Sequence, residues 1–216
     1  MMSRLVIGVF AALTVPTVTA APLEAQGLAP QVSTTVVVNE VAPSGPAGEK
    51  DEFLELRNIS TAPVSLTGFT LRFSGPTCAL TTVLALPAGL VLQPANAAGQ
   101  YLVVTGQDFA GTIYDQTNVL SFVGPDLMRA DVGAVALFDP TGRRVDAVGW
   151  AAPFRSACPQ EGPPARTPPP SLGLSLSRNY LSWDTDNNRN DFNPTPRTPG
   201  AQWPEPLARP ETGLPR

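Results

Sequence analysis

The sequence predicts an all-β protein built as a sandwich of two sheets. Two observations support this prediction. Short segments rich in β-branched and aromatic residues recur along the chain, and turn residues separate them at short intervals. No segment that is long enough for a stable helix combines helical spacing of apolar residues with capping signals at its ends. A chain of 216 residues is long enough for one such domain with additional segments at its ends.

The first expected strand, residues 34–41 (TTVVVNEV), is dense in β-branched side chains, which favour a pleated surface. In residues 52–58, Leu54 and Leu56 alternate with charged and aromatic side chains, so the two sets face opposite sides. Residues 139–142 (DPTG) match a type I turn between two later strands. The further expected strands are residues 64–73, 84–92, 100–105, 118–123, 133–138, 143–150 and 172–178.

Residues 64–73 (VSLTGFTLRF) are predicted to alternate as one long strand or as a pair of strands. One alternating set carries most of the aromatic and aliphatic bulk, and we therefore assign it to the core. The core set is Thr67, Phe69, Leu71 and Phe73, and the opposite set is Leu66, Gly68, Thr70 and Arg72.

The N-terminal residues carry the pattern of a secretory signal peptide. Arg4 gives a positively charged start, residues 5–15 (LVIGVFAALTV) form an apolar run, and residues 18–20 (VTA) match a cleavage site. The run is shorter than the roughly 20 apolar residues that span a bilayer. We predict cleavage after Ala20 or, as a second choice, after Ala25, and a secreted, periplasmic or cell-envelope location.

This prediction divides the chain into four parts. Residues 1–20 form the signal peptide, residues 21–33 a flexible lead-in, residues 34–200 the β-sandwich domain and residues 201–216 a disordered, proline-rich tail. No later segment is long and apolar enough to be a transmembrane anchor of the mature chain.

The chain has two cysteines, Cys78 and Cys158. In an exported protein, two cysteines most simply form one disulfide. Closing the long loop between Cys78 and Cys158 would stabilise the fold by roughly 4 kcal/mol. Both lie beside proline in loop-like sequence, so the bond is expected to tether irregular segments and not to cross the core. The alternative is a pair of free or metal-binding thiols.

Charge and composition exclude several classes of function. The net charge is −4 and Lys50 is the only lysine, so strong nucleic-acid binding is not expected. The chain has no histidine, which removes Ser-His-Asp triads, Cys-His dyads and histidine-rich metal sites.

Several local motifs occur in a fixed order. They are VVVNEV at 36–41, DEFLELRN at 51–58, PVSLTGFTLRF at 63–73, VALFDPTGRRVDAVGW at 135–150, LSLSRN at 174–179, DTDNNRNDF at 184–192 and TPG at 198–200. This succession resembles the lamin-tail domain family, and in particular its bacterial, exported members.

The resemblance implies an immunoglobulin-like β-sandwich over about residues 34–200. It supplies no catalytic mechanism, and it implies no filament assembly because the coiled-coil rod of the lamins is absent. In bacterial relatives this domain often accompanies a secreted nuclease or phosphoesterase domain, which this chain lacks. The longer segments at 78–94 and 106–115 depart from a minimal domain and affect any binding surface carried over from relatives.

Carboxylates are the only residues left for acid–base catalysis. Glu40, Glu52 and Glu55 fall in strand-like segments that could be neighbours, so a glycosidase-like pair is one hypothesis. The alternative, which we favour, is that Glu40 and Glu55 are framework residues bonded to the backbone or to arginine. The chain is therefore expected not to be an enzyme.

Residues 184–191 place oxygen-bearing side chains at every second position, as calcium loops do. The candidate ligands are Asp184, Asp186, Asn188 and Asn190. The segment lacks the turn glycine and the final glutamate of an EF-hand, so an Asx-rich turn is the favoured alternative. We expect no cofactor, with weak calcium binding as the remaining hypothesis.

Tyr180 and Trp183 lie beside this turn and are candidate ligand-binding residues. The function expected from the sequence is a secreted, monomeric, non-enzymatic module with a structural or interaction role toward a protein or envelope component. One alternative is a calcium-dependent or carbohydrate-binding adhesion module. Another is an accessory domain that partners a secreted nuclease or phosphoesterase.

Overall fold

The computed structural model describes residues 32–74, 77–122, 127–153, 158, 161–169 and 172–202. The predicted signal peptide, most of the lead-in and most of the C-terminal tail lie outside the described residues. Among the described residues, no helix is both long enough and apolar enough to cross a membrane.

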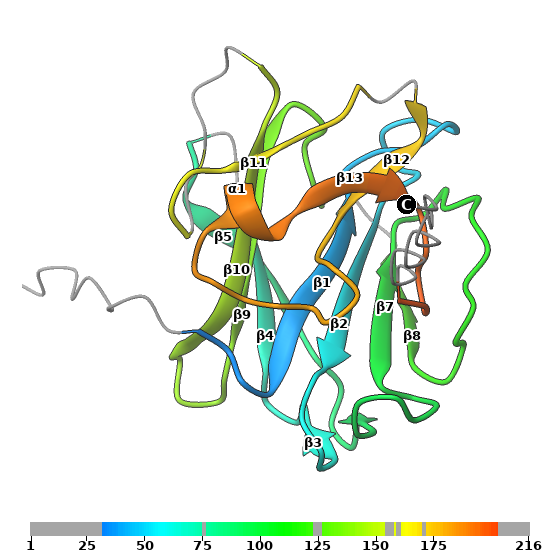
Figure 1. The fold of residues 1–216 in the computed structure, drawn as a ribbon, viewed down its shortest axis with the longest axis vertical. Coiled ribbons are helices and arrows are strands. Elements are labelled where there is room, and N and C mark those ends of the chain that lie inside the picture. The colour runs from blue at the N-terminus through cyan, green and yellow to red at the C-terminus, as the bar shows by residue number, and fades with distance from the viewer. Residues whose placement is uncertain are drawn as a thin grey trace, which may run out of the picture.

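The described chain forms two main sheets (Figure 1). One has the strand order β13-β12-β1-β2-β7-β8, and the other has the order β11-β10-β9-β4-β5. Neighbours pair antiparallel except β7 with β8 and β10 with β11. The first sheet comprises β1 (Val36–Ala42), β2 (Phe53–Asn58), β7 (Tyr101–Thr105), β8 (Val119–Ser121), β12 (Leu174–Ser177) and β13 (Asn193–Pro196). The second comprises β4 (Thr70–Ser74), β5 (Leu80–Ala85), β9 (Val132–Phe138), β10 (Arg144–Ala151) and β11 (Ala165–Arg166).

The two sheets face each other across one apolar core. Alternate residues of each strand point inward, so the core joins side chains of the first sheet, such as Leu54 and Leu56, to side chains of the second, such as Leu71 and Trp150. Burial of this apolar surface is the main source of stability for the sandwich. The all-β fold class predicted from strand spacing is confirmed.

The strand β1 contains a bulge between Val38 and Glu40. One extra residue, Asn39, shifts the alternation, so Val38 and Val41 both reach the core while Glu40 turns to the outer face. The prediction that Leu54 and Leu56 share a face opposite to Glu55 is confirmed, because both leucines belong to the core.

The prediction for residues 64–73 needs a correction. This segment forms β3 (Val64–Ser65) and β4, with a turn at Gly68, whose φ is +80°. Leu71 and Phe73 are in the core as predicted, but Leu66 is also fully buried and Thr67 is exposed. The turn resets the alternation, so the two halves of the segment follow different registers.

Residues 84–92 are not one strand either. The chain forms β5 earlier than predicted and then a short β6 (Val91–Leu92), which pairs with β3. Sequence reasoning also missed β11, β13 and the four-residue helix α1 (Asn188–Asp191). β13 has prolines at two of its four positions, and it lies at the edge of its sheet, where prolines are tolerated.

The disulfide between Cys78 and Cys158 is confirmed, with a Cα–Cα distance of 5.1 Å. Cys78 lies between β4 and β5, and Cys158 follows β10, so neither cysteine belongs to a strand. The bond therefore ties two connecting segments together, as predicted. The turn at residues 139–142 is also confirmed, because Gly142 N–H donates to the carbonyl of Asp139 at 2.9 Å.

Candidate functional site

Arg178 lies at the centre of a buried charged network just after β12. Its Nη2 is 2.9 Å from Asp146 Oδ1 and 3.4 Å from Asp184 Oδ1. Its Nη1 is 2.8 Å from Asp191 Oδ2, and the arginine side chain is 0% exposed. Burial alone would lower the pKa of Arg178, but the surrounding carboxylates raise it above its usual value.

This network joins the two sheets. Arg178 Nε donates to the carbonyl of Val38 on β1 at 2.9 Å, and the Val38 N–H donates to Asp146 Oδ2 at 2.6 Å. Asp146 belongs to β10, where a register shift between Arg144 and Asp146 interrupts the ladder. The Arg178–Asp146 pair therefore satisfies both backbone groups of Val38, which lies in the sheet opposite to that of Asp146.

Glu161 completes an acidic cluster beside the arginine. One carboxylate oxygen from each of Asp146, Glu161 and Asp184 lies within 4.8 Å of the others. Burial, together with the charges of Asp146 and Asp184, raises the pKa of Glu161 to about 9. Burial also raises the pKa of Asp146 to about 6, against the opposing effect of Arg178. At neutral pH the cluster therefore contains a protonated Glu161 next to an ionised Asp146.

Two residues of the proposed calcium loop, Asp184 and Asn188, have other side-chain partners. Asp184 accepts hydrogen bonds from Ser33 N–H at 2.6 Å and from Asp186 N–H at 3.1 Å, and the second of these forms an Asx turn. Asn188 accepts from Gly149 N–H and donates to the carbonyl of Ala147, so its amide serves as a strand partner for the edge of β10.

The four candidate ligands lie in different surroundings, and Asp186 is joined to Asp184 through its own backbone N–H. Asp184 belongs to the arginine network, Asn188 is buried against β10 and Asn190 is exposed. The structure instead brings Asp184 together with Asp146 and Glu161, neither of which the sequence analysis selected. Asp146 interrupts the apolar run of its strand, and this interruption was the available signal.

A second pair of buried carboxylates lies on the outer face of the first sheet. Glu40 and Glu55 are direct cross-strand partners on β1 and β2, and both are 0% exposed. Burial raises the pKa of Glu40 to about 7. Burial and the charge of Glu40 raise the pKa of Glu55 well above its usual value. The pair resembles an acid–base dyad in its titration, but other residues cover it.

The cover is residues 197–202, which we call the C-terminal strap. Glu40 accepts from Thr198 N–H at 2.9 Å and from the Thr198 hydroxyl at 2.9 Å, and Glu55 accepts from Gly200 N–H. We call Glu40, Glu55 and these strap contacts the glutamate clasp. The clasp uses the two carboxylates as fixed acceptors for backbone donors, which is a structural role.

Side chains at both ends of the strap add further contacts. Arg197 pairs with Asp51 at 3.1 Å. Gln202 Oε1 accepts from Arg57 Nη1 at 2.7 Å, and its amide donates to the carbonyl of Asn179 at 2.6 Å. The packed domain therefore extends to residue 202, beyond the predicted boundary at 200, because Gln202 is bonded to three other segments.

Glu52 does not join this pair. Its carboxylate accepts from the N–H groups of Leu127 at 2.8 Å and Met128 at 2.9 Å, and so fixes the start of the segment 127–131. The three glutamates of the hydrolase hypothesis therefore do not converge on one site.

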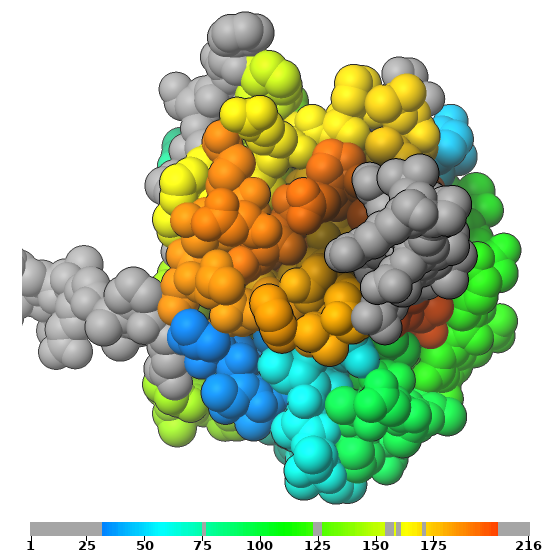
Figure 2. Space-filling model, in the orientation of Figure 1, coloured from blue at the N-terminus to red at the C-terminus, as the bar shows by residue number. Residues whose placement is uncertain are grey.

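Tyr180 and Trp183 lie on a tight loop, residues 179–183. The Asn179 side chain accepts from Leu181 N–H at 3.0 Å and from Trp183 N–H at 3.2 Å, and so closes the loop. Ser182 is fully buried and accepts from Arg57 at 2.8 Å. Leu181 and Trp183, on either side of it, are 42% and 61% exposed. Figure 2 shows the orange segment that contains this loop as part of a continuous layer over one face of the molecule.

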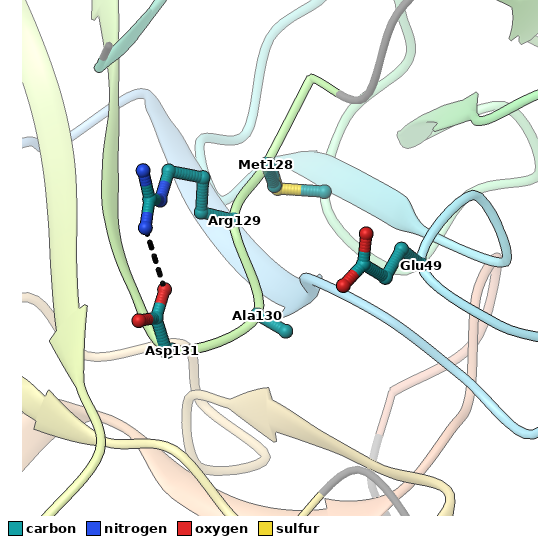
Figure 3. A pocket seen from close by; sticks show the side chains of 5 residues that line it. All are labelled: Glu49, Met128, Arg129, Ala130 and Asp131. Atoms are coloured by element: carbon teal, nitrogen blue, oxygen red, sulfur yellow. Dashed lines mark hydrogen bonds and ion pairs between the residues drawn. The ribbon is translucent and has the colours of Figure 1, made fainter. Parts of the chain in front are cut away.

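Two hollows flank the segment 127–131. The larger one, of about 430 Å³, is lined by Glu49, Met128, Arg129, Ala130 and Asp131. Figure 3 shows the Arg129–Asp131 ion pair on one side of this hollow and Glu49 on the other, with the Glu49 carboxylate pointing into the space between them. The smaller hollow shares Ala130 and Asp131 with the first.

The fold is that of an immunoglobulin-like β-sandwich module. The family model described as Lamin Tail Domain matches residues 29–152. The chain therefore belongs to the lamin tail domain family. A search of curated proteins gives no match.

Among solved structures, the chain is similar to a DUF4876 family protein from Bacteroides thetaiotaomicron. The two share 14% sequence identity over 74% of this chain and 71% of that chain, with a TM-score of 0.44.

Proposed function

We propose that this protein is an exported, non-catalytic interaction module whose contact surface includes the loop 179–183. The observation that carries the proposal is the display of Leu181 and Trp183, which are 42% and 61% exposed on a loop held by Asn179 and the buried Ser182. Large side chains in a fixed position lose little entropy on binding, and tryptophan is frequent among the residues that dominate binding energy.

Export is supported by the disulfide, because such bonds persist in oxidising compartments outside the cytoplasm. The N-terminal signal pattern supports the same location. A non-catalytic role is supported by the tasks of the buried carboxylates. Glu40, Glu52 and Glu55 accept hydrogen bonds from the backbone, and Asp146 accepts from both the backbone and Arg178.

Co-sedimentation with isolated cell-envelope fractions tests this proposal. The purified protein with its disulfide formed should sediment with the envelope, and the double variant L181S/W183S should remain in solution. The control is Leu172→Ser, because Leu172 is 60% exposed but lies outside the loop. Equal sedimentation of the wild type and the double variant would contradict the proposal, as would turnover of a nuclease, phosphoesterase or glycoside substrate.

A carbohydrate is the second candidate for the contact of Trp183, because an exposed indole can stack on the apolar face of a sugar ring. A glycan array distinguishes the two candidates. Binding to defined glycans that is lost in Trp183→Ser but kept in Leu181→Ser would favour carbohydrate. Loss of envelope binding in both variants without glycan binding would favour a protein partner.

A further inference from the structure

The two main sheets have four edge strands, and three of these are protected against pairing with another chain. β13 carries two prolines, β8 has three residues and β11 has two. Prolines and short strands are usual means of preventing pairing at a sheet edge. The fourth edge strand, β5 (Figure 1), has six residues (LTTVLA), none of them proline or charged. β5 is therefore the open edge of the sandwich.

The side chains of β5 are accessible to a partner. Thr81, Thr82, Val83 and Ala85 are exposed, and the exposed fraction of Val83 is 55%. Leu84 packs against the core but is only partly buried at this edge. β-Branched side chains favour an extended backbone, so the strand already has the conformation that pairing needs. An exposed, uncharged edge strand of this kind is a template for a further strand.

The backbone of β5 also has hydrogen-bonding groups that its neighbour does not use. β4 is its only partner among the described strands. The N–H of Leu86, just after β5, donates to the carbonyl of Phe69 at 3.0 Å, on the side of β4. Successive residues of an antiparallel strand direct their backbone groups to opposite sides. Val83 and Ala85 therefore direct their N–H and C=O groups away from β4, toward the open side.

We propose that β5 pairs antiparallel with β5 of a second copy of this chain, around a twofold axis at Leu84. Val83 of each copy then lies opposite Ala85 of the other, and their outward N–H and C=O groups bond to each other across the contact. The two Leu84 side chains meet on the inner face and extend the apolar core from one sandwich to the other. On the outer face, Ala85 of the other copy covers the exposed Val83.

The charge of this edge favours a second copy as the occupant. β5 has no charged residue, so it offers nothing that would select a charged partner strand. The one charged residue of β4 is Arg72, which lies opposite Val83 and has its guanidinium 4.1 Å from the centre of the Phe138 ring. In the proposed pair, three strand spacings, about 14 Å, separate the two Arg72 residues, so salt screens their repulsion.

Pairing of this kind closes at two copies. Each copy contributes its open edge to the same contact, and the other edges of the two described main sheets are protected. A dimer therefore replaces the monomer expected from the sequence. The contact does not involve the loop 179–183 and does not depend on the function proposed for that loop.

Sedimentation equilibrium of the purified, disulfide-bonded protein tests the proposal at concentrations up to about 1 mM, which detects dissociation constants in the millimolar range. We expect the apparent mass to rise with concentration toward that of a dimer. Val83→Lys should remain monomeric, because the two new charges lie diagonally across the contact on one face. Leu172→Lys is the matched control, with the same change of charge at a 60% exposed position outside the strands, and should dimerise like the wild type.

A mixture of two variants distinguishes a second copy from any other occupant of the edge. Val83→Lys and Val83→Glu should each be monomeric alone and should form a heterodimer when mixed, because opposite charges then meet across the contact. Ala85→Pro tests the backbone bonds separately. It removes an N–H that β4 does not use, so this variant should keep the circular dichroism spectrum of the wild type but lose the dimer.

Amide hydrogen exchange locates the contact. In the wild type, exchange at Val83 and Ala85 should slow as the protein concentration rises, whereas in Val83→Lys it should stay fast at every concentration. A wild type that stays monomeric throughout the range, a dimer that persists in Val83→Lys, or assembly beyond two copies would overturn the proposal. A mixture of Val83→Lys and Val83→Glu that stays monomeric would overturn it as well.

Discussion

The Arg178 network and the glutamate clasp both bury carboxylates, but only the first surrounds a cation. Arg178 contacts three aspartates within 3.4 Å. At the clasp, the described contacts of Glu40 and Glu55 are N–H and O–H donors. Arg197 opposes the rise in the pKa of Glu40, and Arg57 opposes the rise in the pKa of Glu55. Neither arginine forms an ion pair with these glutamates among the described residues. A buried carboxylate can thus be stabilised by a paired charge in one place and by a bound proton in the other.

The difference predicts opposite responses to loss of charge. For the three aspartates that contact Arg178 the ionised form is needed, because the arginine would otherwise be buried alone. At the clasp the neutral form is favoured, because two like charges on adjacent strands would repel each other without a cation between them. The following predictions test this contrast, from the largest expected effect to the smallest.

Replacement of Arg178 by methionine should have the largest effect. It removes the cation from Asp146, Asp184 and Asp191, and leaving buried charges unpaired costs about 3–5 kcal/mol in the free energy of unfolding. Urea denaturation at pH 7 measures the loss. The control is Arg143→Met, whose exposed pair with Asp139 should contribute less than about 1 kcal/mol. An Arg178→Met variant as stable as this control would show that the network contributes nothing.

Replacement of Glu161 by glutamine should change the pH dependence of stability. The folded-state pKa of Glu161 is about 9, above the ordinary value of 4.5, so its contribution is fully present below pH 4.5 and is lost as the pH rises toward 9. Glu161→Gln removes this loss, since glutamine stays neutral and can still accept from Asn188. Relative to wild type, the variant should gain about 2 kcal/mol between pH 7 and pH 9.

Unfolding by urea at these two pH values measures the gain. Glu49→Gln is the matched control, because Glu49 is exposed and should show no such change. Parallel pH profiles for wild type and Glu161→Gln would contradict the assignment of a bound proton to Glu161.

Replacement of Gln202 by alanine should have a moderate effect. The variant loses the acceptor for Arg57 and the donor to the carbonyl of Asn179, which together contribute about 1–2 kcal/mol. Thermal unfolding followed by circular dichroism measures the change. Gln116→Ala is the control, because Gln116 makes an exposed contact with the carbonyl of Ile113. Equal melting temperatures for the two variants would show that the end of the strap is not held to the domain.

Calcium should have the smallest effect. Arg178 already provides a cation to Asp184, and Asn188 is bonded to β10, so addition of millimolar calcium should leave the melting temperature unchanged within error. A rise of several degrees that disappears in Asp184→Asn would contradict this expectation and support a calcium loop.

The fold was largely predictable from local patterns. β-Branched alternation located most strands, and the flanking prolines of the cysteines indicated a disulfide between connecting segments. The errors arose where a turn or a bulge changes the register. Because of the turn at Gly68, Leu66 faces the core and Thr67 faces solvent, which is the opposite of the prediction. Counting alternate residues along the segment does not reveal this change.

The charged sites were less predictable because their partners are distant in the chain. Asp146 and Arg178 belong to different sheets, and each lies in or beside an ordinary strand, so only the packing of the two sheets brings them together. Glu161 lies in a proline-rich segment without a local signal. The proximity of Glu40 and Glu55 was anticipated, but the strap that covers them was assigned to the end of the domain and the tail.

A carbon-detected NMR titration of the glutamate side-chain carboxyl groups tests the central contrast most directly, with Glu40→Gln and Glu55→Gln providing the assignments. We predict that the Glu55 carboxyl titrates well above the ordinary glutamate value and that Glu40 titrates near pH 7. Titration of both groups near the ordinary glutamate value of about 4.5 would contradict the account, because the clasp would then hold two buried charges without a contacting cation.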